Sequence, residues 1–335
     1  MIVLADRLVR STTQTAVRHR PRLVLSFDVE EHHLIEAAAG MDVAPALQEY
    51  YRERVAGPTR WLLELLGEHE IKATFFIVGQ IARSDPGLIR SIHQAGHEVA
   101  SHSWEHRRIH TLTPSAFRRD VQKSKDALEQ ITGEAVVGFR APTFSIVRQT
   151  AWAIDILAEL GMLYDSSIYP VWHDRYGIPE APRNPFRVRG GGHTLLEIPP
   201  ATWQVLNSNV PVGGGGYFRL FPLWLLERAW QQRRRSAFPT VTMLYFHPWE
   251  FDARQARLPL GRLSRFRTYV GLHRSRARLS SFLSRQPRGL SLRALDVAHE
   301  LALCTLPLFD MSKTPIAVAQ QPRVRIEDNV QPALG

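Results

Sequence analysis

The stretch LVLSFDVEEHH, residues 23–33, joins a short apolar run to an abrupt burst of charge. The run LVLSF is consistent with a buried strand. Alternation along this strand places Asp28 and Glu30 on the same face. An acidic cluster at the carboxyl end of a strand is costly unless water, a cation or an arginine meets it. The stretch is therefore either a solvated loop or one wall of a functional site.

Short apolar runs recur along the chain and alternate with helical patterns, several of which begin with an Asp-Pro or Thr-Pro pair and end at a glycine. Repeated alternation of this kind predicts an α/β fold with a parallel sheet and crossover helices. Further strands are predicted at residues 74–79, 97–100, 136–139, 163–164 and 241–246. Helices are predicted at residues 58–66, 86–95, 114–132, 149–160, 220–232, 262–284 and 292–303.

Polar side chains stand just after these strands. Besides Asp28 and Glu30, they include His102, Arg140 and Asp165. Such a placement is typical of a barrel whose active site lies at the carboxyl ends of its strands.

A histidine pair is the clearest candidate for metal binding. His102 and His106 stand four residues apart in the stretch SHSWEH, residues 101–106. On a helix they would lie on one face, where two imidazoles can share a metal ion. The same spacing also occurs on surface helices that bind nothing. The pair therefore indicates a metal site only together with the polar residues predicted at the other strand ends.

Residues 171–200 are rich in proline, glycine and arginine and are predicted to form a long insertion. Its last residues, 197–200, are expected to be a short edge strand, because proline is excluded from central strands. The glycine run at residues 213–216 is either a hinge or tight turn, or a loop that covers a substrate.

Length and composition limit the class of protein. The 335 residues are 44% hydrophobic, which is ample for one large core or two smaller ones. The lone Cys304 cannot form an internal disulfide, so nothing requires an oxidising compartment. The first residues lack the apolar core of a signal peptide, and no run of about 18 uncharged apolar residues predicts a membrane span. A cytoplasmic location is expected, at most with peripheral attachment to the inner membrane.

The charge is uneven. The formal net charge is +10, and residues 253–295 hold eleven arginines and no acidic residue. This segment is expected to present either a solvated helix face or a surface for an anionic polysaccharide or acidic lipid headgroups. No aromatic-basic motif accompanies it, so nucleic acid is not expected as a partner. Leu263, Phe266, Val270 and Leu279 suggest an apolar face that fixes a helix to the rest of the protein.

Taken together, five motifs resemble those of the polysaccharide deacetylases, carbohydrate esterase family 4 with its NodB homology domain. The resemblance covers residues 21–255. It rests on Asp28-Val29-Glu30, His102-Ser103-Trp104-Glu105-His106, Arg140-Ala141-Pro142, Tyr164-Asp165-Ser166-Ser167 and Tyr245-Phe246-His247, which occur in the family's order. The stretches SFDVEEHH, RAPTFS, EIPPAT, GGGGYFRLFP and YFHPWEFD are also similar to the branch found in exopolysaccharide loci associated with exosortase-type protein sorting.

The resemblance implies a distorted (β/α)7 barrel with a C-terminal helical extension. Four parts of the chain are then predicted. They are a flexible basic arm at residues 1–20, the catalytic domain at 21–255, an arginine-rich helical extension packed on the barrel at 256–307, and a disordered tail at 308–335.

The resemblance also implies a metal-dependent hydrolase. By the family's pattern, His102 and His106 are two ligands of a divalent ion, most plausibly zinc, with cobalt, nickel and manganese as alternatives. The usual third ligand is an Asp directly after the catalytic Asp, and Val29 stands there. Some relatives space the two acids by one residue, which points to Glu30. Alternation also favours Glu30 over its neighbour Glu31, and the adjacent histidines at residues 32–33 are possible substitutes.

Four further residues match the family's catalytic positions. Asp28 would be the general base that takes the proton of water, and Arg140 would orient it through a charge-assisted bond. His247 would be the general acid that protonates the leaving amine, and Asp165 would stabilise its imidazolium form.

The expected substrate is an N-acetylated sugar polymer or its precursor, in exopolysaccharide biosynthesis. Trp104, Pro142 and Trp249 are expected to contact it, although tryptophans at strand ends are as often packing residues. Two alternatives remain open, namely a hydrolase of a cyclic or linear amide in the same superfamily and a non-catalytic glycan-binding component. The oligomeric state is left open by the sequence.

Overall fold

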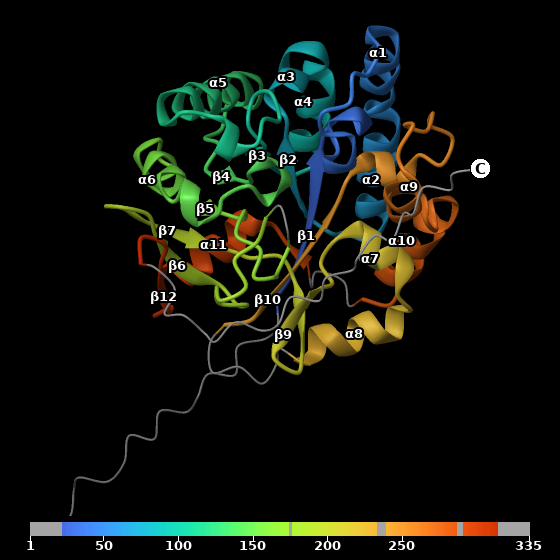
Figure 1. Cartoon of the computed structure of the whole chain (residues 1–335). Coiled ribbons are helices and arrows are strands. Elements are labelled where there is room, and N and C mark those ends of the chain that lie inside the picture. The colour runs from blue at the N-terminus through green and yellow to red at the C-terminus, as the bar shows by residue number, and fades with distance from the viewer. Residues whose placement is uncertain (1–21, 174–175, 233–238, 287–290, 314–335) are drawn as a thin grey trace, which may run out of the picture.

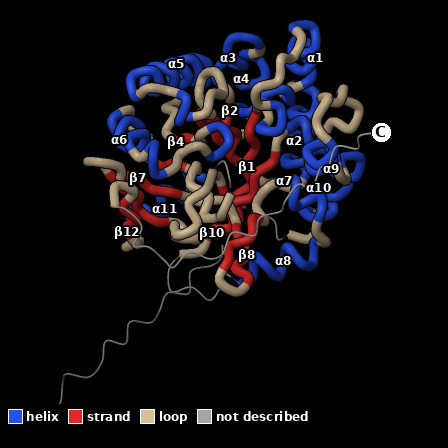
Figure 2. The backbone as a smooth tube through the Cα atoms, in the orientation of Figure 1, coloured by secondary structure: helices blue, strands red, loops and turns tan. Residues whose placement is uncertain are grey.

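A parallel sheet forms the centre of the protein. The computed structural model describes residues 22–173, 176–232, 239–286 and 291–313. The longest strand, β1 (Arg22–Val29), pairs in parallel with β10 (Val241–Phe246) on one side and β2 (Thr74–Ile77) on the other. The order then continues through β3 (Glu98–Ser101), β4 (Gly138–Phe139), β5 (Tyr164–Asp165) and β7 (Thr194–Glu197), all in parallel. Figure 2 shows these strands gathered at the centre, with helices around them.

The ring of strands is not closed by a continuous ladder in the described part of the chain. Instead, single parallel bridges join Pro200 to Met243 and Gly214 to Tyr245 across the gap between β7 and β10. The backbone N–H of Ala201 donates to the carbonyl of Met243 at 2.9 Å. The sequence-based expectation of an α/β fold with a distorted seven-stranded barrel is therefore confirmed, with the distortion located at this seam.

Helices cover the outside of the ring, as Figure 1 shows. Their starts follow the expected capping chemistry, since Asp85 and Thr113 accept hydrogen bonds from the backbone N–H groups of Leu88 and Ala116. The helices up to β5 are α1 (Pro45–Arg54), α2 (Ala56–Glu68), α3 (Gly79–Ser84), α4 (Pro86–Gln94), α5 (Pro114–Thr132) and α6 (Trp152–Glu159). Later helices are α7 (Gly215–Leu220), α8 (Leu223–Gln231), α9 (Arg262–Tyr269), α10 (Ser275–Leu283) and α11 (Ala294–Ala302).

Strand β1 shows how the two faces of the ring differ. Leu25 and Phe27 face the surrounding helices, in a core built with α2, α4 and α10. Val24 lies on the opposite, inner face, where it packs with β10 and α11. Each buried phenylalanine stabilises this arrangement by roughly 2 kcal/mol. Because side chains alternate along a strand, Asp28 shares the inner face with Val24 and emerges at the carboxyl end of the ring.

Several expected elements differ from the structure. The segment at residues 197–200 is not an edge strand, because β7 pairs with β5 and also, in antiparallel fashion, with β6 (Phe186–Arg189). The helix predicted at residues 262–284 is split into α9 and α10, with Gly271 at φ 66° between them. In the glycine run at residues 213–216, Gly214 forms a bridge with Tyr245 and the last two residues begin α7, so the run is not an open loop.

The ends of the chain also need correction. Residues 308–310, predicted to belong to a disordered tail, form β12 (Leu308–Asp310), which pairs with β6. A further short strand, β11 (Ser291–Leu292), pairs with β1 and leads into α11. The hairpin of β8 (Thr202–Val205) and β9 (Ser208–Pro211) forms a separate small sheet. The predicted arm at residues 1–20 and the rest of the tail, from residue 314, lie outside the described residues.

Among the helices that the structure describes, none is both long and apolar enough to cross a lipid bilayer.

Candidate active site

A cavity of about 150 Å³ opens at the carboxyl ends of the strands. Its polar lining comes from residues far apart in the sequence, because parallel strands bring their carboxyl ends to one side of the sheet. Its walls include Asp28, Glu30, His102, His106, His247 and Trp249. Four of the sequence-predicted site residues do not line it, namely Trp104, Arg140, Pro142 and Asp165.

Three of these side chains form a cluster suited to a metal ion. One ligand atom from each of Glu30, His102 and His106 lies within 4.8 Å of the others. The Nε2 atom of His106 lies 2.6 Å from Oε2 of Glu30, and Nε2 of His102 lies 3.9 Å from the same oxygen. Two imidazole nitrogens and one carboxylate are a common donor set of catalytic zinc sites, which keep a further position open for water or substrate.

The histidine pair is not on a helix, contrary to the sequence-based expectation. His102 follows β3 directly, and the chain then turns through two residues of positive φ, Ser103 (66°) and His106 (54°). Such angles are uncommon and costly for residues other than glycine. Hydrogen bonds hold the turn, because Ser103 Oγ accepts from the N–H of His106 at 2.9 Å and its carbonyl accepts from the N–H of Gly79 at 2.8 Å. A local turn thus brings the two imidazoles together, where a helix was expected to do so.

Backbone contacts fix the tautomer of His102. Its Nδ1 lies 2.7 Å from the carbonyl oxygen of Arg140, which can only accept, so Nδ1 carries the proton and Nε2 has a free lone pair. Burial lowers the pKa of His102 to about 4, which keeps the ring neutral at pH 7. A neutral imidazole with a free Nε2 is the form that binds a metal, so this residue fits the ligand role.

The charge of Glu30 suits the same role. Burial alone would raise the pKa of Glu30, but His106 and His247 together hold it well below its usual range. Burial alone would lower the pKa of His106, whereas the Glu30 carboxylate raises it. Glu30 is therefore an anion beside an imidazole whose pKa it raises, and a divalent cation binding here would displace any proton on the ligating nitrogen of His106.

Asp28 is held by an arginine that directly follows β4. The Nη1 atom of Arg140 donates to Oδ1 of Asp28 at 2.6 Å and to Ser26 Oγ at 2.9 Å. Its Nη2 and Nε atoms donate to the side chain and carbonyl of Ser166, at 2.9 and 3.2 Å. Arg140 is fully buried, and its guanidinium carbon lies 4.1 Å from the ring centre of Phe76. The guanidinium thus fixes one oxygen of Asp28 and leaves the other facing the cavity.

His247 follows β10, and its side chain lies near the carboxylates of Glu30 and Asp28. Its Nε2 atom lies 3.6 Å from Oε1 of Glu30 and 3.9 Å from Oδ2 of Asp28. On the other side of the ring, Nδ1 lies 2.9 Å from Oε1 of Glu250, which also accepts from the backbone N–H of His247 at 3.0 Å. Glu250 is buried and forms an ion pair with buried Arg219. The carboxylate at His247 is therefore Glu250, and not Asp165 as the sequence-based reasoning expected.

A sequence signal for Glu250 existed in the stretch HPWE, residues 247–250. A carboxylate three residues after a helix start commonly accepts from the backbone N–H at that start. The short 3₁₀ helix at Pro248–Phe251 uses this arrangement, and it brings the carboxylate to the imidazole as well. Gly215 leaves room for it, since a Cβ atom there would overlap the carboxylate of Glu250.

Asp165 has a different partner. It lies opposite Glu197 in the pairing of β5 with β7, and both side chains are fully buried. Burial raises the pKa of Asp165 to about 6 and the pKa of Glu197 well above its usual range. Two adjacent buried carboxyl groups cannot both ionise cheaply, so the pair shares a proton. The Asp165 side chain is thus buried in the interior of the protein and makes no described contact with His247.

The three expected substrate-binding residues differ in position. Trp249 lines the cavity, with its Nε1 atom 3.4 Å from Glu30 and its ring stacked on His247 at 5.3 Å. Pro142 is buried, and its neighbours Ala141 and Thr143 reach the cavity in its place.

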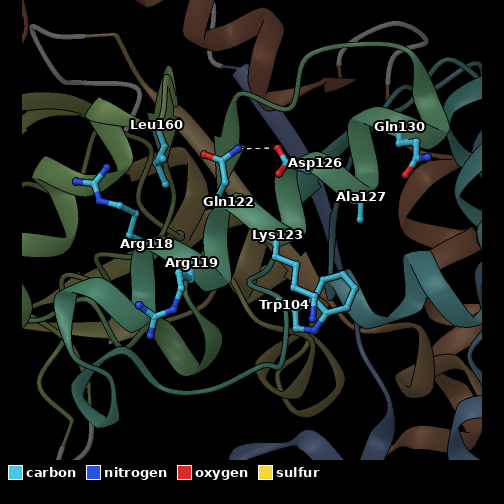
Figure 3. A pocket seen from close by; sticks show the side chains of 9 residues that line it. All are labelled: Trp104, Arg118, Arg119, Gln122, Lys123, Asp126, Ala127, Gln130 and Leu160. Carbon is cyan, nitrogen blue, oxygen red and sulfur yellow. Dashed lines mark hydrogen bonds between the residues drawn. The ribbon is translucent and has the colours of Figure 1, made fainter.

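Trp104 lies elsewhere. It is only 6% exposed, and it packs so closely that a Cβ atom at Gly79 would lie 2.6 Å from its ring. Figure 3 shows it with Lys123 of α5, whose Nζ lies 4.2 Å from the ring centre, in a surface pocket separate from the acid–histidine cavity. The expectation that Trp104 contacts substrate at the catalytic cavity is therefore wrong in position.

The adjacent histidines at residues 32 and 33 are not part of the candidate metal cluster. His32 is buried, its Nε2 lies 2.9 Å from the hydroxyl of Tyr269, and burial lowers its pKa to about 3. Its ring packs at 4.6 Å from the ring of Trp249. His32 therefore supports the aromatic wall of the cavity.

Comparison with known proteins shows which proteins this chain is similar to. Residues 55–164 match the family model described as polysaccharide deacetylase, and residues 166–288 match a model described as a domain of unknown function, DUF3473. The peptidoglycan-N-acetylglucosamine deacetylase of Listeria monocytogenes is 31% identical over 98 residues, which cover 29% of this chain and 21% of that protein. The chitooligosaccharide deacetylase of Rhizobium leguminosarum bv. trifolii is 29% identical over 100 residues, covering 30% of this chain and 44% of that protein. The chain thus spans less than half the length of these relatives.

Solved structures extend the similarity to the whole fold. A structure described as a probable polysaccharide deacetylase from Pseudomonas aeruginosa matches with a TM-score of 0.56 at 18% identity, covering 85% of this chain and 91% of that one. The Puue allantoinase matches with a TM-score of 0.58 at 17% identity, covering 86% and 92%. At such identities the likeness concerns the fold alone. The matched domain and the deacetylase relatives show that residues 55–164 are similar to polysaccharide deacetylases, and the solved structures agree with that family's fold over most of the chain.

Proposed function

We propose that the protein removes N-acetyl groups from an N-acetylated glycan by metal-dependent hydrolysis. The observation that carries the proposal is the convergence of Glu30, His102 and His106 within 4.8 Å, beside Asp28 and His247. A divalent ion bound by this donor set supplies a water of pKa about 7 and polarises the acetyl carbonyl. Zinc suits two imidazoles and one carboxylate, with cobalt, nickel and manganese as alternatives.

The remaining residues move and hold protons. Asp28 accepts the proton of the attacking water, since its Oδ2 faces the cavity while Arg140 holds the other oxygen at 2.6 Å. His247 donates a proton from Nε2 to the leaving amine. Glu250 accepts the Nδ1 hydrogen bond of His247, which orients the ring and stabilises its cationic form.

The proposed substrate is a polymer of N-acetylated sugars or a precursor of one, in exopolysaccharide biosynthesis. Support comes from the names of the relatives, which act on peptidoglycan and chitooligosaccharide, and from the aromatic wall at Trp249. Aromatic rings of this kind pack against the apolar faces of sugars. The resemblance of SFDVEEHH and YFHPWEFD to the exopolysaccharide branch is the reason to prefer that pathway.

Two alternatives have less support. The likeness to an allantoinase fold, at 17% identity, carries no information on substrate. A non-catalytic glycan-binding component would not need Asp28, Arg140 and His247 arranged around the candidate metal cluster. An enzyme that hydrolyses an N-acetyl amide accounts for all of these side chains.

The test is acetate release from N-acetylated chitooligosaccharides, peptidoglycan fragments and exopolysaccharide, with ring opening of allantoin measured separately as a comparison reaction. We expect acetate from at least one glycan, loss of release with a chelator, and recovery with zinc. Elemental analysis should find about one metal equivalent per chain, which His102→Ala should abolish. His110→Ala, at an exposed histidine eight residues later, is the matched control and should keep the metal. Full metal content in His102→Ala, or hydrolysis of allantoin alone, would contradict the proposal.

A further inference from the structure

The arginine-rich segment at residues 253–295 contains two groups of arginines with different surroundings. One group holds the fold together. Arg276 donates from Nε to the carbonyl of Phe251 at 2.8 Å, and Arg278 donates in the same way to the carbonyl of Phe218 at 2.6 Å. These side chains join α10 to the 3₁₀ helix at Pro248–Phe251 and to α7, so their guanidinium groups are already bonded within the protein.

The other group lies on α9 and points outward. Arg262, Arg265 and Arg267 are exposed, and no described carboxylate lies within 4.0 Å of them. The apolar side chains between them are exposed too, since Leu263 is 62% and Phe266 56% exposed. The expectation that Leu263 and Phe266 fix a helix to the barrel is therefore wrong. In this part of the chain, Leu279 of α10 is the fully buried anchor.

The helical repeat places the two apolar side chains between the three arginines around the axis of α9. At about 100° per residue, Leu263 and Phe266 lie about 60° apart around the helix axis. Arg262 and Arg265 flank this apolar pair on one side and Arg267 flanks it on the other. The outward face of α9 is thus an apolar strip with guanidinium groups along both edges.

We propose that α9 docks the protein on the surface of an anionic phospholipid bilayer. An apolar strip edged by basic side chains is the pattern of helices that lie in the headgroup region, where Phe and Leu enter the acyl boundary and Arg meets lipid phosphate. Charge complementarity supports this occupant, because no acidic residue occurs between residues 253 and 295. A soluble anionic polysaccharide would satisfy the arginines but would leave Leu263 and Phe266 in water.

The inner end of α9 is joined to the wall of the cavity. Its residue Tyr269 accepts a hydrogen bond from the N–H of Leu258 at 2.7 Å and contacts His32 at 2.9 Å. The carbonyl of Thr268 accepts from Nη2 of Arg219 at 2.9 Å. A docked α9 therefore holds the catalytic cavity near the bilayer, where a growing or lipid-linked glycan would be found.

The experiment is flotation of the full chain with vesicles of phosphatidylglycerol and phosphatidylcholine, and with phosphatidylcholine alone, at low and at 0.5 M salt. We expect binding to the anionic vesicles at low salt and weaker binding to them at 0.5 M salt, because salt screens the attraction. Binding to the neutral vesicles should be much weaker at both salt concentrations, because they carry no net negative charge. The triple variant Arg262→Gln, Arg265→Gln, Arg267→Gln should bind about 100-fold more weakly, from about fivefold per arginine. The double variant Leu263→Ser, Phe266→Ser should lose the binding that remains at high salt.

A matched control removes three exposed arginines from other helices and loops, by Arg90→Gln, Arg107→Gln and Arg119→Gln. It carries the same change in net charge and should bind nearly as well as the wild type. The proposal is wrong if the control weakens binding as much as the α9 triple variant does. It is also wrong if the wild type ignores anionic vesicles at low salt, or if the Leu263→Ser, Phe266→Ser variant binds anionic vesicles as well as the wild type does at both salt concentrations. The readout is independent of deacetylase activity.

Discussion

The substitution Glu250→Gln tests which carboxylate serves His247. Glutamine keeps the length of the side chain and one acceptor oxygen but removes the charge. In the native protein, Oε1 of Glu250 accepts from Nδ1 of His247 at 2.9 Å, and the cationic imidazole needs that charge while it donates its proton. A hydrogen bond to a charged group contributes about 1.5–3 kcal/mol, so kcat should fall about 10- to 100-fold with little change in KM.

The same substitution also affects stability, because it leaves Arg219 buried without a counter-ion. Burial lowers the pKa of Arg219 to about 10, so the side chain stays cationic at pH 7. Removal of one partner of a buried pair costs about 3–5 kcal/mol of the free energy of unfolding. The double variant Glu250→Gln, Arg219→Gln should recover part of that stability while kcat stays low. Stability and catalysis are thereby separated.

The assay compares Glu250→Gln with Asp165→Asn in steady-state acetate release, with metal content measured in both and folding checked by circular dichroism. Asp165 makes no described contact with His247 and shares its proton with Glu197, so Asp165→Asn should keep kcat within a few-fold. The reasoning fails if Glu250→Gln turns over at the native rate, or if Asp165→Asn, with normal metal content and fold, shows the greater loss in kcat.

Two other predictions follow from the same geometry. Asp28→Asn should keep the metal, because Asp28 is outside the candidate ligand cluster, and should lower acetate release about 10²- to 10⁴-fold through loss of the general base; near-native release would reject that role. Burial raises the pKa of Asp165 to about 6 and that of Glu197 further, so the folded protein holds protons that the unfolded chain releases above its ordinary carboxyl pKa of about 4. The free energy of unfolding should therefore fall as pH rises through this range, and Glu197→Gln should flatten the fall in urea unfolding between pH 5 and 8. An unchanged slope in that variant would assign the pH dependence to other groups.

The parts of the site that the sequence predicted are those fixed by short-range rules. A strand alternates its side chains, so the placement of Asp28 and Glu30 on one face follows from their spacing alone. A parallel sheet brings strand ends together, so His102 and Arg140 could be assigned to the same region before any coordinates were known. Both inferences agree with the cavity, in which Arg140 contacts Asp28 directly.

The parts that the sequence did not predict depend on turns and on contacts between distant segments. The turn after β3 uses positive φ at Ser103 and His106, which is uncommon for residues other than glycine, so a helix was the natural expectation. The sequence-based reasoning assigned Asp165 as the partner of His247. The partner is Glu250 instead, because the 3₁₀ helix after β10 brings that carboxylate to the imidazole. Trp104 was misplaced because its neighbours His102 and His106 face the cavity while the intervening turn directs its ring toward α5.

The site is assembled from three stretches of the chain, and this limits how the chain can be divided. Strand β1, which supplies Asp28 and Glu30, precedes both matched regions, whereas His102 and Arg140 belong to the first region and His247 to the second. The contacts that hold His247 in place involve residues further along the chain. Arg219, which pairs with Glu250, donates from Nε to the carbonyl of Val270 at 3.0 Å and from Nη2 to the carbonyl of Thr268 at 2.9 Å.

A boundary at residue 255 between a catalytic domain and a helical extension would therefore cut through the support of the proposed general acid. The carbonyls of Thr268 and Val270 neutralise part of the cost of burying the Arg219 cation, and that cation holds the carboxylate of Glu250 in place. Hydrogen bonds to a buried charge are worth about 1.5–3 kcal/mol each, so their loss would leave the carboxylate without a fixed partner. The region matched by the second family model thus supports the proposed active site. Direct contacts through Arg219 and Glu250 link the proposed docking helix to His247, the proposed general acid.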